Sequence, residues 1–187
     1  MNKLIGNFIQ PEARVLDLGC GDGSLLAFLR KNNQVRGLGL EIDHLKIQDC
    51  LQKDVNVIDQ DIDSGLSNFQ DQSFDAVIMS QSIQALRKPE VALEEITRIG
   101  KEAIISIPNF ANWRCRLQLI FGGTMPVSSA LPHDWYSTPN IHLCSLKDFE
   151  RLCADHGAEI LERRLLSFDG QEQSFMKAAP NPVSYTH

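Results

Sequence analysis

Short apolar runs alternate with stretches of helical periodicity through most of this 187-residue sequence. The runs are predicted strands, and the stretches between them are predicted helices. Strands joined by helices form right-handed βαβ units, which build a parallel sheet. We therefore predict an α/β fold with a mostly parallel central sheet and helices on both faces. The predicted strands cover residues 14–18, 34–42, 55–58, 74–80, 103–107 and 158–166, and the predicted helices cover 24–31, 44–51, 89–100, 111–121 and 145–157.

The length and composition fit one globular domain, 1–187, with 43% hydrophobic and 22% charged residues. We expect a core over 14–166 and a loop or partner-binding segment over 122–144. We predict irregular structure in the tail, 170–187, because residues 178–182 and 184–187 do not have the pattern of a final antiparallel strand.

The net charge of −6 argues against binding to nucleic acid, which needs a basic face. No apolar run approaches the roughly 20 residues that span a bilayer, so no membrane association is expected. The five cysteines lack CxxC spacing, and an odd number of them fits a disulfide framework poorly. Free thiols in a reducing cytoplasm are the natural interpretation. Four arginines are the visible candidates for a local basic patch: Arg114, Arg116, Arg163 and Arg164.

A glycine-rich turn follows the first predicted strand, at residues 17–23 (DLGCGDG). Glycine is needed where the backbone takes a positive φ or approaches a ligand closely, and the following helix N-terminus presents free N–H groups. The turn reads GxGxG, which differs from the dinucleotide fingerprint GxGxxG. Cys20, between two of the glycines, is small enough to pack under the turn.

The aspartate before the turn, Asp17, distinguishes between possible ligands. A carboxylate there would repel a pyrophosphate and attract a cationic amino-acid group. S-adenosylmethionine has an ammonium group and a sulfonium centre and no phosphate. This charge argument, together with the turn's resemblance to that of class I methyltransferases, predicts S-adenosylmethionine or S-adenosylhomocysteine as the cofactor.

Acidic residues also end the next two predicted strands. Glu41 is predicted to accept hydrogen bonds from the ribose hydroxyls, as in dinucleotide folds, and Asp43 is the alternative for that role. Asp61 is predicted to accept from the adenine amino group, with Ile62 packing on the ring. The fourth strand delivers two polar residues to the same edge. The predicted cofactor contacts are Asp17, Gly19, Cys20, Gly21, Glu41, Asp61, Ile62, Ser80 and Gln81.

Each of these features has a plainer interpretation. A GxGxG run can be a tight turn only, and Asp59 and Asp61 taken alone read as solvated loop residues. Their occurrence in order, at consecutive strand ends, favours the cofactor site, because ligands of open α/β sheets bind at the carboxyl ends of the strands.

Four further segments resemble the MetW family of methionine biosynthesis proteins, whose fold is the Rossmann-like class I methyltransferase fold. They are residues 80–85 (SQSIQA), 106–110 (SIPNF), 125–128 (MPVS) and 135–144 (WYSTPNIHLC). The resemblance covers residues 14 to about 165. It implies a bacterial, cytoplasmic protein that works with homoserine O-acyltransferase, and it supplies no methyl acceptor.

The catalytic evidence is thin. No Ser-His-Asp spacing and no metal cluster is visible, so no metal is expected. His133-Asp134 reads as a solvated turn, whereas His142, between two apolar neighbours, favours a packed residue. Two main hypotheses remain: a cofactor-binding partner subunit, and a methyltransferase acting on a small molecule. A methyltransferase fold without cofactor is a weaker third. Candidate acceptor or partner contacts are Trp135, Tyr136, Asn140 and His142.

Overall fold

A computed structural model of the chain describes residues 1–127, 132–168 and 171–180. Its strands are β1 (Arg14–Leu18), β2 (Arg36–Glu41), β3 (Val57–Asp59), β4 (Phe74–Ser80), β5 (Gly100–Pro108), β6 (Ala158–Phe168) and β7 (Gln171–Pro180). Its α-helices are α1 (Asn2–Phe8), α2 (Ser24–Asn33), α3 (His44–Gln52), α4 (Pro89–Ile99), α5 (Trp113–Leu117) and α6 (Leu146–Asp155). Shorter helical turns are η1 (Ile62–Ser64), η2 (Ile83–Ala85) and the π-helical η3 (Gln118–Gly122).

The strands form a seven-stranded sheet in the order β3-β2-β1-β4-β5-β7-β6. The pairs among β1 to β5 are parallel, and β7 is antiparallel to both β5 and β6. The strand order changes direction between β1 and β4, and ligands bind open α/β sheets at such switch points. The predicted mostly parallel sheet is confirmed, and most element boundaries differ from prediction by one to three residues.

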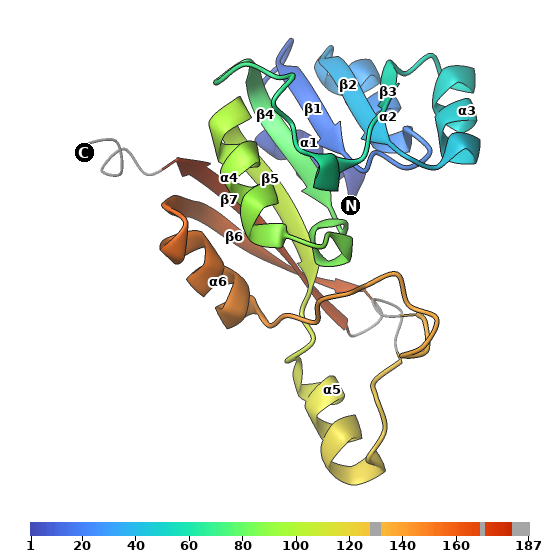
Figure 1. Cartoon of the computed structure of the whole chain (residues 1–187), viewed down its shortest axis with the longest axis vertical. Coiled ribbons are helices and arrows are strands. Elements are labelled where there is room, and N and C mark those ends of the chain that lie inside the picture. Colours follow the sequence, from blue (N-terminus) through green and yellow to red (C-terminus); the bar gives the residue numbers. More distant parts are fainter. Residues whose placement is uncertain (128–131, 169–170, 181–187) are drawn as a thin grey trace.

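Helices cover both faces of the sheet, as predicted (Figure 1). On one face, α1, α2 and α3 contribute Ile5, Leu29 and Cys50 to a buried cluster. On the other face, α4 and α6 contribute Leu93 and Phe149 to a second cluster. Alternate residues of a strand point to opposite faces, so neighbouring β4 residues fall into different clusters.

Residues 171–180 of the tail form strand β7, where the sequence pattern predicted irregular structure. β7 runs along β5 from Ala103 opposite Ala178 to Pro108 opposite Gln173. Met176 and Ala178 are buried, whereas Lys177 between them pairs with Glu102. The prediction for 171–180 is therefore wrong, because two small or flexible apolar residues at alternate positions give little strand signal until a sheet edge packs on them. Residues 181–187 lie outside the described residues.

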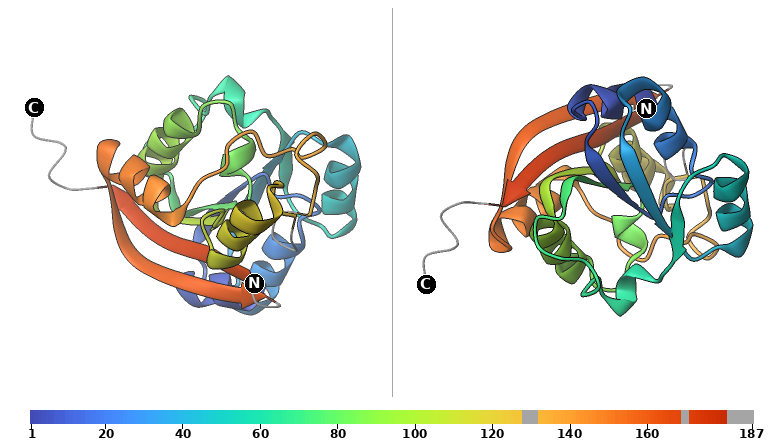
Figure 2. Two further views of the ribbon diagram at one scale, coloured as in Figure 1. Left: turned by 90° about the horizontal axis from the view of Figure 1, so that it is seen from below. Right: turned by 90° about the horizontal axis from the view of Figure 1, so that it is seen from above.

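The segment after β5 stands away from the sheet. The predicted helix over 111–121 is divided into α5 and the π-helical η3, which protrude from the body in Figure 1. Figure 2 shows β6 and β7 curving along the opposite side of the molecule from α3. Helix α1 was not predicted, and it anchors itself through the fully buried Ile5. Within the described residues, no helix is long and apolar enough to cross a membrane.

Candidate functional site

The glycine turn after β1 has the backbone that its sequence requires. Gly19, Gly21 and Gly23 have φ values of 72°, 59° and 73°, which side chains rarely adopt. A Cβ on Gly19 would lie 3.1 Å from the Cβ of Ser82, whereas a Cβ on Gly21 would enter open space. Glycine at position 19 therefore permits both the turn and the close packing of the segment after β4.

Cys20 packs under this turn, as predicted. Its side chain is buried, and its Sγ lies 3.9 Å from the Sγ of Cys50. Burial, and then the negative charge of Asp17, raise the pKa of its thiol far above the usual range. Because this thiol belongs to the protein core, Cys20 can serve a ligand only through its backbone.

A cavity of about 530 Å³ lies at the carboxyl ends of β1, β2 and β4. Among the predicted cofactor contacts, six line it: Gly19, Glu41, Asp61, Ile62, Ser80 and Gln81. Asp17, Cys20 and Gly21 do not line it. The residues that the sequence did not assign to the cofactor are Leu40, Ile42, Lys46, Gln60, Asp63, Ser82, Ala85, Leu86, Pro139 and Asn140, together with the alternative Asp43.

The side chain of Glu41 is held in this cavity by three hydrogen bonds. One carboxylate oxygen accepts from the backbone N–H of Gly21 at 2.8 Å, and the other accepts from Ile42 and Asp43 at 3.0 and 3.1 Å. An ionised carboxylate has about four acceptor positions, so capacity remains for a ligand hydroxyl. Glu41 thus fixes the glycine turn against the end of β2.

Asp43 has a structural role of its own. Its side chain accepts from the N–H of Leu45 at 2.9 Å and caps α3. Both Glu41 and Asp43 line the cavity, so the geometry leaves the choice between them for ribose binding open.

Asp17 lies fully buried beside Glu41, in the middle of the sheet. Burial, followed by repulsion from Glu41, raises its pKa from 3.8 to about 7. Its Oδ1 has no hydrogen-bond partner among the described residues. An ionised carboxylate with an unpaired buried oxygen is costly, so burial favours the protonated, neutral form of Asp17.

We expect Asp17 to make stability depend on pH. Between about pH 4 and 7 the folded protein retains a proton on Asp17 that the unfolded chain has lost, so the free energy of unfolding falls as pH rises. The substitution Asp17→Asn removes this pH-dependent contribution to the free energy of unfolding. The stability of the variant relative to wild type should rise by up to about 1.4 kcal/mol per pH unit in this window and level off above it. Urea unfolding at a series of pH values measures the difference.

Asp75→Asn is the matched control for this measurement. Hydrogen bonds from the Lys101 side chain and the Arg14 N–H lower the pKa of Asp75, so its contribution changes below pH 4 instead. A relative stability of Asp17→Asn that stays constant from pH 4 to 7 would contradict the assignment.

Asp61, the predicted contact of the adenine amino group, lies at the start of η1. Its carboxylate accepts from the N–H of Asp63 at 2.9 Å, and Asp63 in turn accepts from the N–H of Arg87. Ile62 is half-buried against the core. Both Asp61 and Ile62 line the cavity, and their contacts with adenine stay a prediction.

Two polar residues follow at the end of β4. The hydroxyl oxygens of Ser80 and Ser106 are 3.2 Å apart. Gln81 has a φ of 57°, and its N–H donates to the carbonyl of Ser106 at 3.0 Å. A non-glycine residue held with positive φ at a cavity wall is a frequent mark of functional sites.

The loop before α6 reaches this site through Gln84. The backbone N–H groups of Ile141 and His142 both donate to the Gln84 carbonyl at 2.9 Å. This contact brings Pro139 and Asn140 to the cavity wall. His142 itself is exposed and lines neither this cavity nor the next, so its interpretation as a packed residue is wrong: its backbone is held, but its ring is not covered.

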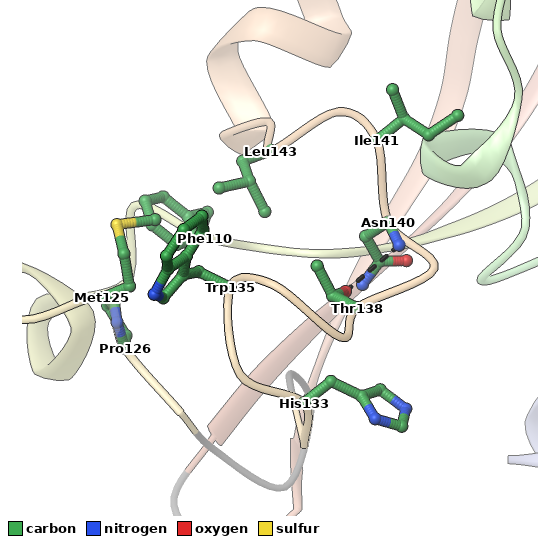
Figure 3. Close-up of a pocket in the computed structure, with 9 residues that line it drawn as sticks. All are labelled: Phe110, Met125, Pro126, His133, Trp135, Thr138, Asn140, Ile141 and Leu143. Carbon is green, nitrogen blue, oxygen red and sulfur yellow. Dashed lines mark hydrogen bonds between the residues drawn. The ribbon is translucent and has the colours of Figure 1, made fainter.

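The aromatic pair of the loop is strongly exposed. Trp135 and Tyr136 are 74% and 73% exposed, and their rings meet edge to face at 5.7 Å. The Tyr136 hydroxyl donates to Asp134 at 3.2 Å. Trp135 lines a second cavity of about 350 Å³, which also includes His133 and Asn140, whereas Tyr136 does not line it (Figure 3).

No group of metal-ligating side chains occurs in the described part of the chain.

Comparison with known proteins identifies the family. The family described as "Methionine biosynthesis protein MetW" matches residues 2–186. The chain belongs to the MetW family. This confirms the resemblance found in the sequence motifs. A curated relative, the bifunctional methionine biosynthesis protein MetXA/MetW of Rhodopirellula baltica, is 35% identical over 153 residues. The alignment covers 77% of this MetW-family chain and 25% of that protein, so the chain spans about a quarter of the relative's length.

Solved structures confirm the fold. The [4+2]-cyclase SpnF has a TM-score of 0.74 at 17% identity, covering 96% of this chain and 80% of that one. Magnesium protoporphyrin IX methyltransferase of Synechocystis PCC 6803 with bound SAH has a TM-score of 0.71 at 18% identity, covering 96% and 79%. The chain therefore has the class I methyltransferase fold. Since this fold is shared by a cyclase and a methyltransferase, it does not by itself decide the activity.

Proposed function

We propose that this MetW-family protein binds S-adenosylmethionine or S-adenosylhomocysteine and acts with homoserine O-acyltransferase to support homoserine acylation. The observation that carries the partnership is the relative whose name joins MetXA and MetW in one protein. We infer that the MetXA part is the acyltransferase that the family resemblance implies. A separate chain of the MetW type would then bind that enzyme non-covalently.

The cavity at the strand ends supports the cofactor. Its volume of about 530 Å³ falls in the range of ligand sites. Four carboxylates line it, Glu41, Asp43, Asp61 and Asp63, against one Lys46. Such a lining suits the ammonium and sulfonium charges of S-adenosylmethionine and disfavours a pyrophosphate.

The chain's residues have distinct roles in this proposal. Gly19 allows the backbone to approach the cofactor, and Glu41 accepts from the ribose hydroxyls while it holds the turn through the N–H of Gly21. Asp61 accepts from the adenine amino group, and Ile62 packs on the ring. Asp17 does not line the cavity and lies buried just before the turn, so it has no direct contact with the cofactor in this proposal.

A methyltransferase acting on a small molecule is the second candidate function. The second cavity favours it, because Asn140 lines both cavities and an acceptor there would lie beside the cofactor. His133 also lines that cavity, and it is the candidate for holding an acceptor's proton.

We propose a cytoplasmic location because of the state of the cysteines. All five are free thiols, although Cys20 and Cys50 lie close together. Unpaired cysteines in such proximity fit a reducing compartment.

The deciding experiment measures homoserine acylation by the acyltransferase with and without this chain, across a titration of S-adenosylmethionine. We expect co-purification of the two proteins and a higher acylation rate when the chain is present. A rate that also varies with the cofactor requires different cofactor affinities in the free and bound chain. Unchanged acylation together with no co-purification would reject the partnership and leave the methyltransferase.

A further inference from the structure

The second cavity is a built feature outside the proposed cofactor site. Its walls come from three separate segments: the end of β5 near Phe110, residues 125–126 after η3, and residues 133–143 before α6. Its volume of about 350 Å³ is at the lower end of the range for small-molecule sites. Figure 3 shows the side chains that form it.

One end of this cavity is apolar. Figure 3 shows the side chains of Leu143 and Met125 directed toward the rings of Phe110 and Trp135. Two rings, a thioether and a branched aliphatic chain offer contacts to a flat or branched apolar body. Phe110 and Met125 precede the loop that holds Trp135 and Leu143, so the four side chains meet only when the chain is folded.

The other end is polar and adjoins the cofactor cavity. Thr138 Oγ1 accepts from the backbone N–H of Asn140 at 3.1 Å and fixes that residue. The side-chain amide of Asn140 makes no hydrogen bond to the residues that the structure describes. Asn140 lines both cavities, and the ring of His133 lies on this side, away from the apolar end. This end can therefore bind one neutral polar group.

The lining contains no Asp, Glu, Lys or Arg among its described residues. A free amino acid would bring an ammonium and a carboxylate into this cavity without a partner for either, which costs free energy. The cofactor cavity, with its four carboxylates, is the opposite case. The two cavities thus select for ligands of different charge.

We propose that the second cavity binds a small uncharged molecule with an aromatic or branched aliphatic body and one neutral polar group. The body lies among Phe110, Met125, Trp135 and Leu143, and the polar group faces Asn140. The proposal goes beyond the partnership with the acyltransferase and does not depend on it, since the site belongs to this chain alone.

The four methionines of the chain allow a direct test by NMR of their ε-methyl groups. Met125 lines the cavity, whereas Met79 and Met176 are buried in the core and serve as internal references. The probe is benzyl alcohol, and phenylalanine is the zwitterionic control with the same ring. We expect benzyl alcohol to shift the Met125 signal saturably, and phenylalanine to require at least about tenfold higher concentration.

Leu143→Arg is the blocking variant, since Leu143 is 45% exposed and the new charge can reach water without unfolding the protein. Leu161→Arg on β6 is the matched control, because Leu161 is similarly exposed and lies outside the cavity. Binding should weaken at least about tenfold in the first variant and stay unchanged in the second. An unmoved Met125 signal, equal binding of phenylalanine, or binding that survives Leu143→Arg would overturn the proposal.

Discussion

Gly19→Val is expected to abolish binding of S-adenosylmethionine and S-adenosylhomocysteine. Residue 19 has a φ of 72°, where a β-branched side chain is strained, and its Cβ would lie 3.1 Å from Ser82. Relief of that contact moves either the glycine turn or the segment after β4, and both line the cofactor cavity. Thermal unfolding with and without S-adenosylhomocysteine measures the loss. Wild type at a ligand concentration of about one hundred times Kd should gain roughly 2.7 kcal/mol, and the variant should gain nothing.

Gly123→Val is the matched control. Gly123 has a φ of 63°, so the substitution brings similar backbone strain, but it lies after η3 and does not line the cofactor cavity. Its stability should fall while its response to the ligand stays that of wild type. A full ligand response in Gly19→Val, or none in wild type at millimolar ligand, would contradict the cofactor site.

The sequence was most informative where structure is local. Strands β1 to β5 were predicted because each carries a short apolar run between turn residues, and the strands that are buried, such as β1 and β4, need that composition. The capping box of α6 was also visible, since Ser145 and Asp148 bond reciprocally within four residues. Helix α1 gave a weak signal, because its seven residues are stabilised by packing against α2.

The sequence predicted only those site residues that lie at or just after the end of a strand. Glu41 ends β2 and Asp61 comes two residues after β3, so the rule for parallel sheets placed them at one edge. Asn140 was assigned to an acceptor or partner, yet it lies on the cofactor cavity wall. That position depends on two hydrogen bonds to the Gln84 carbonyl, a contact between segments more than fifty residues apart. No local pattern encodes it, and the same holds for the pairing of β7 with β5.

Simultaneous Trp135→Ala and Tyr136→Ala substitution is expected to remove the support of homoserine acylation. The two rings are mostly exposed and packed edge to face, so they present an apolar surface on the loop before α6. Tryptophan and tyrosine dominate binding hot spots, because they bury a large area and lose little conformational entropy. Loss of such a pair typically costs at least 2 kcal/mol, which is about a thirtyfold rise in Kd. Titration of the acyltransferase with the variant, read as acylation rate, measures it.

Trp113→Ala is the control of matched residue type. Trp113 is 60% exposed on α5, where the Arg114 guanidinium lies 5.3 Å from its ring centroid, and it lines neither cavity. The proposal requires this variant to support acylation as wild type does. Equal losses in both variants would extend the contact surface to the protruding helix α5, whereas a full effect of the doubly substituted chain on acylation would exclude the loop as the contact. Cofactor binding measured on the same samples distinguishes loss of the fold from loss of the partner surface. A variant that binds the cofactor normally has kept its fold and lost only its partner surface.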